Sequence, residues 1–85
     1  MDREELKLEL KKLIIAECQK DLRPEDIGDA VQLIGGPLDF DSLDALQISL
    51  AIKKHYDKRI EGNTETRKAL ASIDALADFI LYDKL

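Results

Sequence analysis

The stretch that decides the fold lies in the middle of the chain and reads Asp39-Phe40-Asp41-Ser42-Leu43-Asp44-Ala45-Leu46. It marks the change from a loop that contains glycine and proline to a helix. Asp41 or Ser42 can supply the N-cap, and Asp44 adds a negative charge in the first turn, where the helix dipole favours it. We therefore expect a helix over about residues 42–56, with the Ser42 hydroxyl at its start.

This predicted helix is apolar on more than one side. Its apolar side chains are Leu43, Leu46, Ile48, Leu50, Ala51, Ile52 and Tyr56. Such a helix is either central to its bundle or partly exposed to a partner. Its C-terminal end carries Lys53, Lys54, His55 and Lys58, the sign of charge that the dipole favours there.

The segment before the motif predicts one helix and a long loop. Apolar residues recur at helical spacing over about residues 2–20, with charged residues, including Lys7 and Lys11, covering the other side. Glycines and prolines then punctuate residues 21–41 and predict a loop. A structureless loop of this length is uncommon, so we expect a short helical turn near residues 25–34.

The segment after the motif predicts two shorter helices. Asn63 or Thr64 can cap a helix through about Ala71, and Ser72 can cap a last one. No strand pattern and no repeat is present. The sequence therefore predicts one all-α domain over residues 1–85, a small bundle of three to four helices with a long loop between the first two.

Composition narrows the class of protein. Hydrophobic residues make up 45% of the 85 residues and charged residues 36%, as in soluble globular proteins. No apolar run approaches the ~20 residues that span a bilayer, and no signal-peptide core follows the charged N-terminus. We therefore expect a cytoplasmic monomer without a membrane span. Cys18 is the only cysteine, which excludes an internal disulfide and favours a buried structural thiol.

The net charge of −5 is unevenly distributed. Residues 21–44 hold seven acidic residues and one basic residue, a net charge of −6, whereas residues 45–60 carry +3. The acidic segment argues against nucleic acid as a partner, because phosphates would be repelled. It suits docking onto basic patches of protein partners, or it is simply a solvated acidic loop.

The chain lacks the residues that catalysis requires. A nucleophilic Ser42 needs a base within hydrogen-bond reach, but the only histidine, His55, lies 13 residues further along the same predicted helix, about 20 Å away. One histidine and one cysteine give no metal site, and no phosphate-binding glycine loop is present. We expect no catalytic residues, no metal and no enzymatic activity. From local chemistry alone, Ser42 is a helix cap.

A resemblance changes the interpretation of Ser42. The segment Asp41-Ser42-Leu43-Asp44 resembles the Asp-Ser-Leu motif of acyl carrier proteins, in which the serine bears 4′-phosphopantetheine. Residues 38–44 resemble the loop-to-helix junction of that family, and residues 69–80 resemble its closing segment. The similarity covers essentially the whole chain. It implies an acyl-carrier-like helical bundle that presents acyl thioesters from Ser42, beside the motif residue Asp41, to enzymes of lipid, polyketide or related secondary biosynthesis.

The resemblance also implies partners and a face that they recognise. The partners would be a phosphopantetheinyl transferase and acyl-transferring and condensing enzymes. The predicted recognition residues are Leu43, Asp44, Gln47, Leu50, Lys53 and Lys54. Housekeeping fatty-acid carriers have an acidic second helix, whereas this one ends in Lys53 and Lys54. Like charges across an interface are unfavourable, so we expect a specialised carrier with its own partners.

Two alternatives stay open from the sequence. A carrier of the same fold can hold an aminoacyl or peptidyl group, because a thioester is generic. A protein of another class, a small helical interaction module, would use Ser42 only as a cap.

Overall fold

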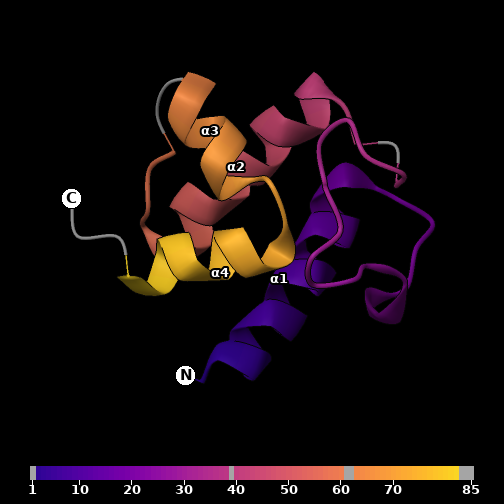
Figure 1. The fold of residues 1–85 in the computed structure, drawn as a ribbon, viewed down its shortest axis with the longest axis horizontal. Helices are drawn as coiled ribbons and strands as arrows, with labels where there is room; N and C mark the ends of the chain where they lie inside the picture. Colours follow the sequence, from indigo (N-terminus) through magenta and orange to yellow (C-terminus); the bar gives the residue numbers. More distant parts are fainter. Residues whose placement is uncertain (1, 39, 61–62, 83–85) are drawn as a thin grey trace.

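The computed structural model describes residues 2–38, 40–60 and 63–82, without the side chains of residues 63 and 65. These ranges contain the helices α1 (Arg3–Cys18), η1 (Pro24–Asp26, a 3-10 turn), α2 (Ser42–Tyr56), α3 (Asn63–Ala69) and α4 (Ile73–Tyr82), as Figure 1 shows. Within them, strand-like pairing is limited to one bridge, between Ile34 and Phe40. The prediction of a small all-α bundle is therefore confirmed. Asp39, in the stretch that opens the sequence analysis, and residues 61–62 lie outside the described residues.

The first helix forms where the apolar spacing predicts it. The Asp2 carboxylate caps its N-terminus by accepting a hydrogen bond from the Glu5 N–H at 2.8 Å. Gln19, in the left-handed region with φ of 53°, ends it. Its buried apolar side chains, Leu6, Leu10 and Ile14, face the core. In Figure 1, α1 rises from the N-terminus at the bottom, and the loop that follows lies on the right.

The prediction that Lys7 and Lys11 cover the solvent side of α1 is wrong. Lys7 is only 8% exposed, and the Lys11 side chain is 16% exposed. Both lie on the flank of α1 that faces the loop and α4, where carboxylates take up their charges. A lysine stem can be buried when its ammonium finds such partners.

The loop between α1 and α2 contains less helix than the sequence predicts. Among the described residues of this loop, only η1 is helical, because the backbone of the following segment pairs with distant parts of the chain. The Leu33 N–H donates to the Ala71 carbonyl at 3.1 Å, and the Asp74 N–H donates to the Asp29 carbonyl at 2.9 Å. A glycine is required at position 36, since a Cβ there would clash with the Gln32 carbonyl.

One cluster of buried side chains joins all these parts. α1 packs against α2 and α4, and α3 packs against α4. The loop contributes Ile27, Leu33 and Phe40, each about 1% exposed or less. None of the helices in the described ranges combines the length and the apolar character needed to cross a membrane.

The last two helices begin near the predicted positions. α3 starts at Asn63 and ends at Ala69, two residues before the predicted end. The Ser72 hydroxyl accepts a hydrogen bond from the Ala75 N–H at 3.1 Å, so it caps α4 as predicted. Ile73, Leu76 and Ala77 are buried on the core side of α4.

Candidate functional site

The start of α2 is held by a reciprocal pair of aspartates. The Asp44 N–H donates to the Asp41 carboxylate at 3.0 Å, and the Asp41 N–H donates to the Asp44 carboxylate at 3.0 Å. This is a capping box, and it satisfies two backbone donors at the helix start. The sequence left open whether Asp41 or Ser42 is the cap, and the structure assigns the cap to Asp41.

Ser42 is consequently left without a capping role. It is the first residue of α2 and is exposed. Its hydroxyl makes no hydrogen bond to any part of the chain that the structure describes. The exposed hydroxyl next to the free N–H groups of a helix start can therefore carry a substituent without breaking a protein contact.

The residue before this site is anchored in the core. Phe40 is 1% exposed, and its carbonyl accepts a hydrogen bond from the Gly35 N–H at 2.9 Å. Gly35 has a φ of +74°, a conformation that favours glycine, so the turn brings the loop back to Phe40. The buried ring and the capping box fix the position of Ser42 from both sides.

Lys20 sets the charge beside the site. Its ammonium lies 3.1 Å from the Asp44 carboxylate and 5.2 Å from the centre of the Phe40 ring. Burial raises the pKa of Asp44, but the hydrogen bond from the Asp41 backbone and the contact with Lys20 outweigh it, so the pKa is lowered. Asp44 therefore stays charged and paired at neutral pH, while Asp41 stays exposed.

The Cys18 side chain contacts the first turn of α2 at the backbone of Asp44. Its sulfur lies 3.8 Å from the Asp44 carbonyl oxygen. Burial, and next the charge of Asp44, raise the pKa of the thiol to about 11. A thiol with this pKa is protonated at neutral pH and is a poor nucleophile. Cys18 is partly rather than fully buried, so the prediction of a buried thiol is only partly correct, but the raised pKa agrees with a structural role.

The predicted recognition residues do not all lie in one environment. Leu43 and Leu50 are 72% and 59% exposed, and Gln47, Lys53 and Lys54 are exposed beside them. The Asp44 side chain is only 14% exposed and turns toward Lys20. Leu46, which the sequence analysis did not place on this face, is 56% exposed. Its spacing from Leu43 and Leu50, three and four residues, is the signal that could have placed it there.

A pocket lies one helical turn from Ser42. It has a volume of about 610 Å³. Ala45 of α2 lines one part of it, and the rest is lined by the loop, by α3 and by the α3–α4 turn, including Ile34, Arg67 and Leu70. Its lining is mixed, with apolar side chains such as Ile34 and Leu70 and polar ones such as Gln32 and Arg67. The volume falls within the range of small-molecule sites.

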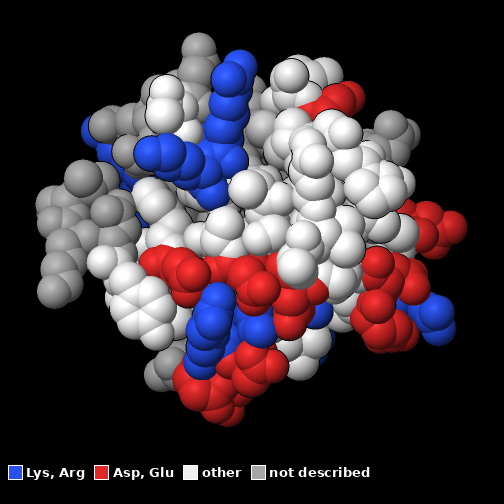
Figure 2. All heavy atoms as spheres, viewed as in Figure 1, with Lys and Arg blue, Asp and Glu red and all other residues white. Residues whose placement is uncertain are grey.

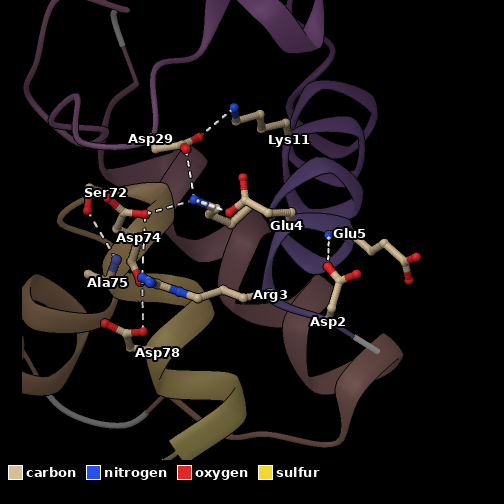
Figure 3. Close-up of polar contacts among 11 residues, drawn as sticks. Asp2, Arg3, Glu4, Glu5, Lys11, Asp29, Ser72, Asp74, Ala75 and Asp78 are labelled. Atoms are coloured by element: carbon tan, nitrogen blue, oxygen red, sulfur yellow. Dashed lines mark hydrogen bonds and ion pairs between the residues drawn. The ribbon is translucent and has the colours of Figure 1, made fainter.

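A second polar cluster lies away from Ser42, where α1, the loop and α4 meet. The Lys7 ammonium lies 2.8 Å from Asp29, 2.7 Å from Glu4 and 3.4 Å from Asp74. Figure 3 shows Asp29 also pointing toward Lys11, at 2.6 Å. Figure 2 shows acidic and basic side chains intermixed over this part of the surface. Each lysine of the cluster is paired with at least one carboxylate, which indicates a structural role.

Arg3 extends this cluster along α4. Its guanidinium lies 3.4 Å from Asp74 and 3.0 Å from Asp78. These contacts, drawn in Figure 3, join the first turn of α1 to α4. The two ion pairs therefore hold the N-terminal end of α1 against α4.

Among the residues that the structure describes, none is placed as a catalytic base for Ser42. α2 is one continuous helix from Ser42 to Tyr56, so His55 lies about 20 Å from Ser42 along the axis. Asp41 and Asp44 are both engaged in capping. In the described ranges, no three His, Cys, Asp or Glu side chains converge to hold a metal ion. The described part of the site presents an exposed hydroxyl at the start of α2.

Comparison with known proteins gives no assignment. No protein-family model matches the chain, and a search of curated proteins found no similar sequence.

Proposed function

We propose that this protein is an acyl carrier, with 4′-phosphopantetheine attached to the Ser42 hydroxyl. The proposal rests on one observation at the start of α2. Asp41 caps the helix, and the exposed hydroxyl of Ser42 makes no hydrogen bond within the described structure. A serine that acted only as a cap would accept the hydrogen bond that Asp41 accepts here. The protein would hold and present cargo, and partner enzymes would perform the chemistry.

The residues around Ser42 fit this group. The Ser42 oxygen would form the phosphoester, and the N–H groups of the first turn of α2 would face its phosphate with the positive end of the helix dipole. That attraction is worth only about 0.3–1 kcal/mol at an exposed site, so it would orient the group and the covalent bond would hold it. Lys20 offsets the charge of Asp44 and thereby lessens repulsion of a phosphate. The group supplies a thiol that carries an acyl chain as a thioester.

The pocket beside Ala45 supports a role in holding cargo. Ala45 follows Ser42 by three residues and so lies about one turn along the same side of α2. Ile34 and Leu70 give the pocket apolar lining, whereas Arg67 and Thr66 add polar groups to it. Such a lining suits a short cargo that has both an apolar part and a polar group.

The direct test is enzymatic loading of purified protein. The protein is incubated with coenzyme A, Mg²⁺ and a phosphopantetheinyl transferase of broad specificity. In the expected reaction the Ser42 oxygen attacks the pantetheine-bearing phosphorus of coenzyme A, the phosphoanhydride bond breaks, adenosine 3′,5′-bisphosphate leaves, and the hydroxyl proton is released. Intact mass spectrometry should show a gain of one phosphopantetheine.

Two variants make this test specific. Ser42→Ala should abolish the mass gain. Ser49→Ala is the matched control, since Ser49 lies on the same helix and its hydroxyl only donates to the Ala45 carbonyl at 2.9 Å. It should load like the unmodified sequence. If the protein gains no mass, or gains it equally in Ser42→Ala, the carrier proposal is refuted.

The exposed leucines of α2 favour a second candidate, a helical interaction module that has no prosthetic group. The loading experiment separates the two, because a module without a tether point gains no mass. An aminoacyl or peptidyl carrier would load in the same way as an acyl carrier. The mass of the thioester on protein from its native cells then distinguishes an acyl group from an amino acid or peptide.

A further inference from the structure

We propose that the outer face of α2 docks an acidic partner protein, whose apolar side chains cover three leucines and whose carboxylates pair with Lys54. The docking face consists of Leu43, Leu46, Gln47, Leu50 and Lys54. It adjoins Ser42, so the inference deepens the proposed function and names the chemistry of its partners.

The apolar part of the docking face is unusually exposed. Leu43, Leu46 and Leu50 are 72%, 56% and 59% exposed, although buried residues of the same helix, such as Ile48 and Ile52, are 1% exposed or less. At 3.6 residues per turn, all five residues of the docking face fall within about 100° of arc. The core side of α2 is already satisfied by Ala45, Ile48, Ala51 and Ile52. A separate stripe of leucines on the opposite side is typical of a protein interaction site.

The charges along the docking face select the sign of the partner. At its N-terminal end, Asp44 is paired with Lys20 at 3.1 Å and is largely buried, whereas Asp41 is exposed. Lys53 is paired with Asp57 at 2.6 Å, so these two charges largely cancel. The Lys54 ammonium is exposed and makes no ion pair with any other described residue. Residues 53–59 still hold four basic residues against one acidic residue. A basic surface would be repelled at this end, and an acidic one attracted.

The helix geometry fixes how such a partner would be laid out. Lys54 follows Ser42 by 12 residues, which corresponds to about 18 Å along α2. The partner therefore places its carboxylates about 18 Å from the entrance that receives Ser42 and its substituent. The apolar groove of the partner, which receives the three leucines, runs between these carboxylates and that entrance. This arrangement distinguishes it from a partner whose docking patch is basic.

The experiment uses the unmodified protein and a pair of synthetic amphipathic helical peptides. Both peptides carry leucines at i, i+3 and i+7, and one has glutamates on its flanks where the other has lysines. Binding is followed by ¹H–¹⁵N chemical-shift titration. We expect the glutamate peptide to shift the amides of the docking face and to bind at least about tenfold more tightly than the lysine peptide.

Charge reversal tests the role of the basic end. Lys53→Glu/Lys54→Glu should invert the preference between the peptides. The matched control is Lys12→Glu/Lys68→Glu, the same change of charge at exposed lysines on α1 and α3, and it should leave the preference unchanged. Leu46→Ser should weaken both peptides. Circular dichroism confirms that each variant is folded.

Three results would overturn the inference. The first is equal or tighter binding of the lysine peptide, and the second is no binding of either peptide. The third is self-association in sedimentation experiments that Leu50→Ser abolishes, because the face would then serve a second copy of this chain. None of these readouts requires phosphopantetheine, so a failed loading test leaves this result interpretable, and a failed docking test leaves the carrier proposal standing.

Discussion

The Lys20 ammonium lies 3.1 Å from the Asp44 carboxylate, and this contact links the segment after α1 to the first turn of α2. It belongs to a wider pattern. The acidic segment of residues 21–44 is offset in space by bases of the N-terminal region, since Asp29 pairs with Lys7 at 2.8 Å and with Lys11 at 2.6 Å. The acidic field beside Ser42 is therefore weaker than the linear charge distribution indicates.

Removing the N-cap should matter more than removing the neighbouring serine. Asp41→Ala loses the acceptor for the Asp44 N–H and should lower the free energy of unfolding by about 1 kcal/mol. Ser42→Ala breaks no described hydrogen bond and should change it by less than about 0.5 kcal/mol. Urea unfolding of both variants measures the difference. A larger loss in Ser42→Ala would mean that Ser42 is the cap.

The two sides of α2 should respond differently to truncation. Ile48→Ala removes a side chain that is 1% exposed and should destabilise the protein by about 2–5 kcal/mol. Leu46→Ala, at 56% exposure, should change stability by less than about 0.5 kcal/mol. The urea midpoints of the two variants, compared at an unchanged m-value, measure the difference in stability. Equal losses would show that the leucine stripe is buried in solution.

Lys7 should be more important for stability than its position on a charged stretch suggests. Lys7→Met keeps most of the buried stem but removes the ammonium that contacts Glu4, Asp29 and Asp74. Asp29 and Asp74 then face each other without that cation, so the urea midpoint should fall. Lys12→Met is the control. Because Lys12 is exposed, this substitution should leave the urea midpoint unchanged. Equal midpoints in the two variants would contradict the structural role of the cluster.

The Asp29 carboxylate should make stability depend on acid. Hydrogen bonds from Lys11, and next from Lys7, lower the pKa of Asp29 below its ordinary value. The unfolded chain, with an aspartate pKa of about 3.9, then takes up the proton first. The stabilisation is present above this value and is lost as the pH falls through the lowered pKa of the folded state. Unfolding measured from pH 6 to 2 should show a smaller decline in Asp29→Asn than in the unaltered protein.

The Cys18 thiol should be unreactive in the folded protein. With a pKa of about 11, only about one thiol in a thousand is ionised at pH 8. Alkylation by iodoacetamide at pH 8 should therefore be much slower than in urea, where the pKa returns to about 8.5. Intact mass over time measures both rates. Similar rates in the two conditions would show that the thiol is not held against Asp44.

Local signals were sufficient for most of the helices. The predicted range 42–56 agrees with α2, because a capping aspartate, an acid in the first turn and bases in the last turn all mark the same ends. Ser72 was predicted as a cap for the same reason. The helical turn expected near residues 25–34 was predicted too long. Its backbone is paired with Ala71 and α4, and no local pattern reports a contact across 38 residues or more.

The environment of individual charges could not be predicted in the same way. Lys7 was expected in solvent because helical periodicity assigns faces from one helix at a time. Its burial depends on carboxylates supplied by Asp29 and Asp74, which lie 22 and 67 residues away. The exposure of Leu46 likewise depends on which side of α2 meets α1.

The sequence by itself determined where the four α-helices begin, both ends of α2 and which serine stands at its start, because caps, dipole charges and glycine turns act within a few residues. Only the tertiary structure decided that Asp41 is the cap that frees the Ser42 hydroxyl, that Asp44 is neutralised by Lys20, and that three leucines of α2 face outward. These outcomes depend on which helix faces pack together, and packing joins residues far apart in the chain.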